Sequence, residues 1–210
     1  MKLYNFPASP NAIKVWAVIH HLGFEVESVV INFGEGTMQS DEYGKINPNR
    51  LMPALVDGDF SLWESNAIMQ YLANKAGDTK LWPSDPRAQA DVSRWQCWQL
   101  AHWGQCMRPF MYENVVKKLF KMGPPDAAKL AEGAEMLHKH APVLETHLAN
   151  RTWVCGDHVT LADFALASPL GYAEAAGIPL QDYPNIRAWY GRLEALESWK
   201  KAQPPMPSHA

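Results

Sequence analysis

Over the first 77 residues, apolar positions recur with two different periods. Short alternating runs predict strands, and runs with apolar residues three and four positions apart predict helices. The predicted strands are Lys2–Asn5, Glu25–Ile31, Ala54–Val56 and Phe60–Leu62, and the predicted helices are Pro10–Leu22, a short one within Asn32–Lys45, and Ser65–Ala76. Asp57-Gly58-Asp59 between the last two strands is typical of a tight hairpin. This order predicts a small α/β sheet and matches the thioredoxin fold.

The pattern changes after Gly77. A proline-containing linker, 78–86, leads into a part of the chain whose periodicity is helical throughout. The predicted helices are 87–121 with a break near Pro109, 126–149, 160–176 and 184–202, followed by a tail, 203–210, that we expect to be mobile. Thr160 and Asp163 predict an N-terminal cap on the third of these helices. The sequence therefore predicts two domains, an α/β domain at 1–77 and an all-α domain at 87–202.

Composition narrows the classes of function. The chain has 210 residues, 47% of them hydrophobic, and a net charge of −3, and its Lys and Arg residues form no run interleaved with aromatics. Nucleic acid and anionic membrane surfaces are therefore not expected partners. The chain shows neither a signal peptide nor a bilayer-spanning apolar stretch. Its three cysteines form no CxxC pair, which favours reduced thiols and a cytoplasmic location. His102, His138 and His140 lack metal-ligand spacing on one helix face, so we expect no metal.

The segment between the first strand and the first helix carries the first candidate chemistry. Ser9 stands at the N-cap of the predicted helix and Pro10 at its first position. One interpretation is a plain helix cap, which stabilises by about 1 kcal/mol and is common. The other is that the Ser9 hydroxyl donates a hydrogen bond to a bound thiolate, assisted by the positive end of the helix.

Two later segments could hold an extended peptide. Pro53 enters a predicted strand, and a cis bond before it would expose the N–H and C=O groups of Met52 for pairing, whereas a trans turn proline is the more common case. Glu64-Ser65 begins a helix directly after a strand. Ser65 and the first helical N–H groups could bind a carboxylate, and Glu64 could accept from an ammonium; the alternative is an acidic, capped first turn.

Taken together, these segments resemble the cytosolic glutathione S-transferase family over nearly the whole chain. The ordered set comprises the Ser9 segment, Asn-Pro-x-x-x-x-Pro-Ala-Leu ending at Leu55, Glu64-Ser65-x-Ala67-Ile68, Gly156-Asp157-x-x-Thr160-Leu161-Ala162-Asp163, and Tyr183-Pro184-Asn185-Ile186 with Trp189. The resemblance implies a thioredoxin-like N-terminal domain plus an all-α helical C-terminal domain, the glutathione transferase fold. Ser9 is similar to the catalytic serine of the phi- and theta-like classes. Ser9-Pro10-Asn11 resembles a bacterial, nu-like group in which the Asn also approaches the glutathione sulfur.

The resemblance also implies the remaining site residues. Glutathione would be held as a co-substrate by Met52 and Pro53 at its cysteinyl backbone, and by Glu64 and Ser65 at its γ-glutamyl end. Leu51 replaces the Lys or Gln that the family often has there. Arg50, with help from Gln39, is our candidate partner for the glycine carboxylate, and a solvated loop arginine is the alternative. Phe6, Trp103 and Met107 are candidates for the second-substrate pocket, with packing in the core equally favoured for the set.

The family's activity is attack of the glutathione thiolate on an electrophilic small molecule, as in detoxification. Two alternatives use the same site: a glutathione-dependent peroxidase or disulfide reductase, which Ser9-Pro10-Asn11 favours, and a non-catalytic protein that binds glutathione or apolar ligands, which Leu51 favours. The family also implies a homodimer in which the N-terminal domain of one subunit packs against the helical domain of the other.

Overall fold

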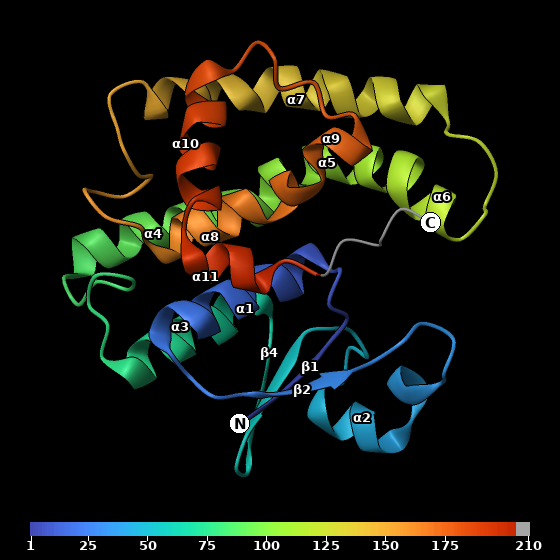
Figure 1. The fold of residues 1–210 in the computed structure, drawn as a ribbon, viewed down its shortest axis with the longest axis vertical. Coiled ribbons are helices and arrows are strands. Elements are labelled where there is room, and N and C mark those ends of the chain that lie inside the picture. Colours follow the sequence, from blue (N-terminus) through green and yellow to red (C-terminus); the bar gives the residue numbers. More distant parts are fainter. Residues whose placement is uncertain (205–210) are drawn as a thin grey trace. The chain divides into compact units, whose positions relative to one another are not determined.

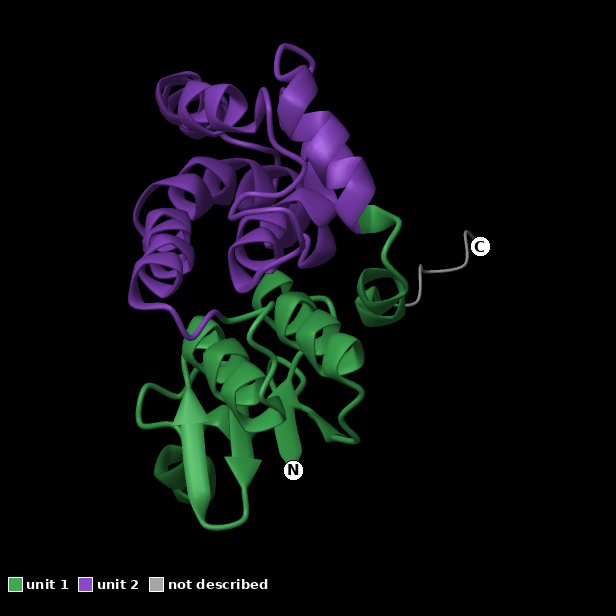
Figure 2. Cartoon of the chain, turned by 90° about the vertical axis from the view of Figure 1, so that its left-hand side faces the viewer, with its two compact units in different colours: residues 1–82, 194–210 green, residues 83–193 purple. Residues whose placement is uncertain are grey.

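The computed structural model describes residues 1–204, so most of the tail predicted to be mobile lies outside the described residues. The chain forms two compact units (Figure 2). The first contains residues 1–82 together with the segment from Glu194 onward, and the second contains residues 83–193. From the sequence, 194–202 was expected to belong to the helical domain. These residues group with the first unit because α11 (Glu197–Ala202) packs against α1 (Pro10–Leu22).

The first unit is built on a four-stranded mixed sheet with the order β2-β1-β3-β4 (Figure 1). Its strands are β1 (Lys2–Asn5), β2 (Glu27–Val30), β3 (Ala54–Asp57) and β4 (Phe60–Trp63). β1 pairs in parallel with β2 and antiparallel with β3, where Leu3 lies opposite Leu55, and β3 and β4 form the predicted hairpin. The thioredoxin-like sheet predicted from the sequence is confirmed.

Two helices, α1 and α3 (Ser65–Ala76), lie side by side over this sheet (Figure 1). Their bounds are those predicted, and each ends at a glycine with positive φ, 71° at Gly23 and 68° at Gly77. A residue with a Cβ atom is strained in that conformation, which makes glycine an effective helix stop. The helices bury apolar residues at helical spacing, including Ile13, Val15, Val18 and Ile19 from α1 and Ile68, Met69 and Leu72 from α3.

A third, short helix, α2 (Asp41–Ile46), follows the 3-10 turn η1 (Thr37–Gln39) in the stretch where one irregular helix was predicted. Ser40 caps α2, because its hydroxyl oxygen accepts a hydrogen bond from the Tyr43 N–H at 3.1 Å. Tyr43 itself is buried and packs its ring against Tyr4 of β1. The contact between Tyr43 and Tyr4 holds α2 against β1. The loop that leads into β3 begins directly after α2.

The secondary-structure elements described in the second unit are all helices, joined by turns and loops. Its elements are α4 (Pro86–Trp98), η2 (Gln99–Trp103), α5 (Gly104–Phe110), η3 (Met111–Val116), α6 (Lys117–Leu119), α7 (Ala127–Leu148), α8 (Leu161–Ala167), η4 (Ser168–Tyr172), α9 (Ala173–Ala176) and α10 (Pro184–Glu194). The break predicted near Pro109 is wrong: the chain stays helical from Pro86 to Leu119 with Pro109 inside α5. The flanking segments η2 and η3 are π-helical, the type of wider turn that accommodates a missing hydrogen bond.

The predicted cap at Thr160 is present and forms a fully buried network. The Asp163 carboxylate accepts hydrogen bonds from the Thr160 N–H at 2.8 Å, the Thr160 hydroxyl at 3.0 Å, the Val154 N–H at 2.9 Å and the Trp189 indole N–H at 2.8 Å. Burial raises the pKa of Asp163, and these donors oppose that effect. The motif therefore ties the loop before α8 and the helix α10 to a single side chain.

Candidate functional site

A loop between α2 and β3 forms one wall of the candidate site. The carbonyl oxygen of Leu51 accepts two hydrogen bonds at 2.7 Å, one from the Asn47 side-chain amide and one from the Tyr43 hydroxyl. Burial raises the pKa of Tyr43 to about 12, so this hydroxyl keeps its proton and remains a donor at neutral pH. Asn47 also accepts from the Asn49 N–H at 3.0 Å, the local turn that Asn side chains favour.

The residues that follow this turn present free backbone groups. The Met52–Pro53 peptide bond is cis, the less common of the two possibilities that the sequence left open. Met52 precedes the first paired residue of β3, Ala54. Within residues 1–204, its N–H and C=O groups have no backbone or side-chain partner. They can therefore pair with an extended ligand, as an edge strand does.

Ser9 stands at the start of α1 without capping it. Its backbone is extended, and its carbonyl accepts from the Ala12 and Ile13 N–H groups, but its side chain makes no capping hydrogen bond. No other partner for the hydroxyl is found in the described part of the chain. The interpretation of Ser9 as a plain cap is therefore wrong. The hydroxyl is available to a ligand at the positive end of α1.

The start of α3 faces the start of α1. Glu64, at the N-cap of α3, has φ 69° and ψ 111°, a conformation that is strained for a residue with a side chain. Ser65 follows as the first helical residue, and its hydroxyl donates to the Asn11 amide oxygen at 3.4 Å. Backbone strain of this kind clusters at binding sites, which makes Glu64 notable beyond its charge.

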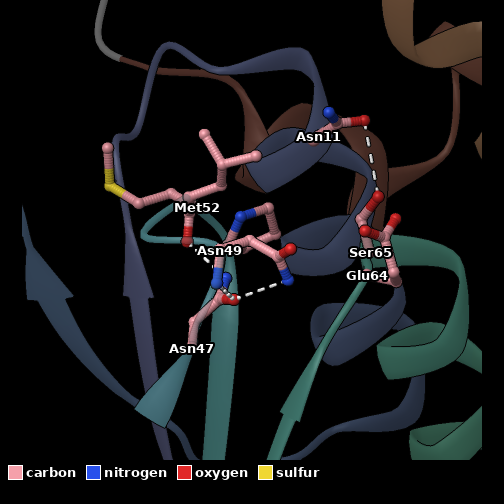
Figure 3. Close-up of a pocket in the computed structure, with 8 residues that line it drawn as sticks. Asn11, Asn47, Asn49, Met52, Glu64 and Ser65 are labelled. Atoms are coloured by element: carbon pink, nitrogen blue, oxygen red, sulfur yellow. Dashed lines mark hydrogen bonds between the residues drawn. The ribbon is translucent and has the colours of Figure 1, made fainter. Parts of the chain in front are cut away.

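These segments enclose a cavity of about 150 Å³ within the first unit (Figure 3). It is lined by Asn11, Asn47, Asn49, Leu51, Met52, Pro53, Glu64 and Ser65. Six of the residues singled out from the sequence therefore meet in one place, although they come from three separate segments. The sequence analysis did not select Asn47 and Asn49. The signal that could have found them is the sequence Asn47-Pro48-Asn49 itself, because Asn next to Pro is typical of a turn.

Arg50 and Gln39 do not line this cavity. The Arg50 guanidinium donates to the backbone carbonyls of Ser40 at 2.7 Å and Met38 at 3.1 Å. The guanidinium also lies close to Gly44, because a Cβ atom on Gly44 would be 3.0 Å from the Nη2 atom of Arg50. These contacts favour the alternative for Arg50, a residue that ties the turn after Asn47 to the segment before α2, over a residue that reaches the ligand.

The three candidates for a second-substrate pocket divide between the units. Trp103 and Met107 belong to the second unit and are buried; the Trp103 indole N–H donates to the Leu166 carbonyl at 2.9 Å, and its ring stacks on Trp98. These contacts favour packing for both. Phe6 is partly exposed in the first unit, where the Ser9 N–H donates to its carbonyl at 2.9 Å and the ring of Phe33 lies edge-on at 5.0 Å.

The described residues also bear on two other classes of site. No cluster of three His, Cys, Asp or Glu side chains suited to a metal ion occurs among residues 1–204. None of the helices in the same range combines the length and apolar character needed to cross a bilayer.

Comparison with known proteins supplies the family context. Residues 1–74 match the model for the glutathione S-transferase N-terminal domain, and residues 109–197 match that for the C-terminal domain. Glutathione S-transferase 3 of Zea mays is 33% identical over 99% of this chain and 97% of its own length. The solved structure of glutathione S-transferase III in apo form is 34% identical, with a TM-score of 0.85 over 98% of this chain and 99% of that one. A structure of glutathione S-transferase I bound with lactoylglutathione is 29% identical, with a TM-score of 0.87 over 96% and 97% of the two chains.

Proposed function

The chain belongs to the glutathione S-transferase family, and we propose that it catalyses attack of the glutathione thiolate on an electrophilic small molecule. In this reaction the sulfur forms a bond to the electrophilic carbon, the leaving group departs from that carbon, and the thiol proton passes to solvent. The observation that carries the proposal is the free hydroxyl of Ser9 at the start of α1. A hydroxyl that caps no helix can donate to a sulfur anion.

Ser9 would act by favouring the charged form of the bound thiol. A free cysteine thiol has a pKa of about 8.5, so most of it is protonated at neutral pH. A hydrogen bond from Ser9 and the positive end of α1 both stabilise the thiolate and lower that pKa. Asn11, two residues after Ser9, lines the cavity, whereas Ser9 is not among its lining residues, and the Asn11 amide is the second candidate donor to the sulfur. This supports placement among the serine-type classes, phi-, theta- or nu-like.

The rest of the cavity suits the remainder of glutathione. We assign the free N–H and C=O of Met52 to the cysteinyl backbone, next to Pro53. The γ-glutamyl end would lie at the start of α3, where Ser65 and the first N–H groups face a carboxylate and Glu64 accepts from the ammonium. The related structure of glutathione S-transferase I holds lactoylglutathione, which supports a glutathione-like ligand here.

The glycine end and the electrophile need other partners than those first considered. With Arg50 bound to backbone carbonyls, the polar side chains that line the cavity and are not yet assigned to the sulfur or the γ-glutamyl end are the amides of Asn47 and Asn49. We therefore propose that Asn49 faces the glycine carboxylate. For the electrophile, Phe6 and Phe33 offer an apolar surface beside Ser9 in the first unit.

An assay with three electrophiles tests this function against its alternatives. The purified protein is given glutathione with an aryl halide, an organic hydroperoxide or a glutathione mixed disulfide. We expect turnover of the aryl halide. Preference for the hydroperoxide or the disulfide would support the peroxidase or reductase, for which the position of Asn11 in the cavity is the specific argument. Glutathione binding without turnover of any of the three would support the binding protein.

We also propose that the protein is a cytoplasmic homodimer. The three cysteines are free thiols, as a reducing compartment maintains. On the second unit, an apolar cavity of about 250 Å³ is lined by Arg94, Trp95, Trp98, Val143 and His147, and the Val143 side chain is exposed. A surface of this kind fits a second copy of the chain. Sedimentation of the wild type and of Val143→Asp tests this: we expect a dimer that the variant weakens, and a monomeric wild type at micromolar concentration would contradict it.

A further inference from the structure

A fully buried lysine lies beneath the candidate site. Lys14, on the second turn of α1, has no exposed surface, although lysine is rarely buried without a reason. Its ammonium donates a 2.8 Å hydrogen bond to the side-chain oxygen of Asn66, which is also buried. Asn66 directly follows Ser65 in the first turn of α3. The contact therefore joins α1 to the turn that borders the cavity.

Two side-chain contacts thus set the start of α3 against α1. One is the hydrogen bond between Lys14 and Asn66, and the other is that between Ser65 and Asn11. The first brings the Lys14 ammonium to the start of α3. The negative charge of Glu64, at the N-cap of α3, raises the pKa of Lys14.

A further helix, α11, also packs against α1, and its charge acts on another residue. Lys201 of α11 lowers the pKa of His20, near the end of α1, after the larger effect of burial. His20 therefore titrates below its ordinary range and lies almost two turns beyond Lys14.

We propose that Lys14 is a positioning residue of the glutathione site and that its ammonium must be protonated for the γ-glutamyl carboxylate to bind well at the start of α3. The inference rests on the proposed function, because it concerns the same ligand. The positive end of α3 and a buried ammonium behind it both attract a carboxylate, and the attraction is strong where water is excluded. A neutral amine would leave the helix end alone to hold that charge.

The buried position of Lys14 brings the titration of its ammonium close to neutral pH. Burial lowers the pKa of Lys14 to about 7, against the opposing effect of Glu64. By linkage, a carboxylate that binds better to the protonated form raises this pKa and takes up a proton on binding. Affinity should therefore fall as pH rises from 6 to 8, by about tenfold if only the protonated form binds.

Calorimetry with S-methylglutathione tests the inference. This probe has no thiol to ionise, so the protein supplies the pH dependence. We expect the wild-type Kd to rise about tenfold from pH 6 to 8, with proton uptake visible as a dependence of the binding enthalpy on the buffer. Lys14→Met should bind weakly with no pH dependence. Lys14→Arg, which keeps its charge, should bind tightly at both pH values. Lys75→Met, which alters a lysine at the other end of α3, should behave as the wild type.

The outcomes separate this inference from the proposed function. A wild type that binds the probe with a flat pH profile overturns the role of Lys14 and leaves the function standing. Lys14→Met with the wild-type pH profile does the same. A wild type that binds neither S-methylglutathione nor glutathione at any pH overturns the proposed function, and the inference with it. Should one variant fail to fold, the wild-type profile and proton uptake still decide the question.

Discussion

The hydroxyl of Ser65 donates to the amide oxygen of Asn11 over 3.4 Å, although the two residues are 54 positions apart in the chain. The bond joins the first residue of α3 to the second residue of α1 at the edge of the cavity (Figure 3). Two segments that the sequence marks separately therefore act as one surface. Changes on either side of this contact should affect one site.

Ser9→Ala should reduce turnover without reducing stability. A hydrogen bond to a charged group contributes about 1.5–3 kcal/mol, so kcat/KM should fall roughly 10- to 100-fold. The pKa of the bound thiol in the pH–rate profile should rise. Thermal unfolding should be unchanged, because Ser9 makes no capping bond. Ser40→Ala, which removes a real cap, is the comparison and should lose about 1 kcal/mol. An unchanged pH–rate profile in Ser9→Ala would transfer the role to Asn11.

Arg50→Ala should destabilise the loop after α2 rather than weaken the binding of one end of the ligand. The variant loses the hydrogen bonds to Met38 and Ser40, which should lower the free energy of unfolding by about 1–3 kcal/mol. The Michaelis constants for glutathione and for its glycine ethyl ester should then change by similar factors.

The ester comparison decides the role of Arg50. If glutathione is affected several-fold and the ester is not, Arg50 binds the glycine carboxylate after all. Arg87→Ala, at an exposed position near the start of α4, controls for loss of a positive charge and should change neither thiol.

Asp163→Ala should be among the most destabilising single changes in the second unit. It leaves the Val154 N–H, the Thr160 N–H and the Trp189 indole without their buried acceptor. Each unsatisfied buried donor costs about 1–3 kcal/mol, so we expect a loss of about 3–5 kcal/mol in denaturant unfolding. Asp157→Ala, at an exposed position in the same loop, should change stability by less than about 0.5 kcal/mol. Equal effects of the two would show that the network contributes little.

Lys14 should make the stability of the protein rise with pH above neutrality. Its folded-state pKa of about 7 lies below the 10.5 of an unperturbed lysine, so between these values the unfolded chain holds a proton that the folded chain has lost. The free energy of unfolding then rises with pH, at up to about 1.4 kcal/mol per pH unit from this group. The difference between wild type and Lys14→Met in urea unfolding at pH 6, 8 and 9.5 isolates the effect.

The sign of this effect separates two roles of Lys14. Stability should rise over the same pH interval in which S-methylglutathione affinity falls, because burial disfavours the charge that the ligand requires. Stability and affinity that fall together would indicate a structural ion pair. A difference between the two proteins that does not vary with pH would show that burial does not lower the pKa of Lys14 in the folded chain.

The local pattern of apolar residues, prolines and glycines determined the helices and strands of this protein. The bounds of α1 and α3 follow from apolar spacing, a proline at the start of α1, and the glycines that end both helices. These signals act over neighbouring residues, so the sequence carries them directly. The cap at Thr160 and Asp163 was readable for the same reason, whereas its link to Trp189, 26 positions away, was not.

Tertiary structure decided what each polar side chain does. Ser9 has a capping residue's position but a free hydroxyl, Arg50 turns to the carbonyls of Met38 and Ser40, and Lys14 is buried against Asn66. A side chain takes the partner that packing brings within hydrogen-bond distance, and for Lys14 that partner is 52 positions away. Neither periodicity nor spacing encodes such a pairing. The sequence therefore indicated the segments that form the candidate site, and the packing of α1 against α3 decided which of their side chains pair with one another.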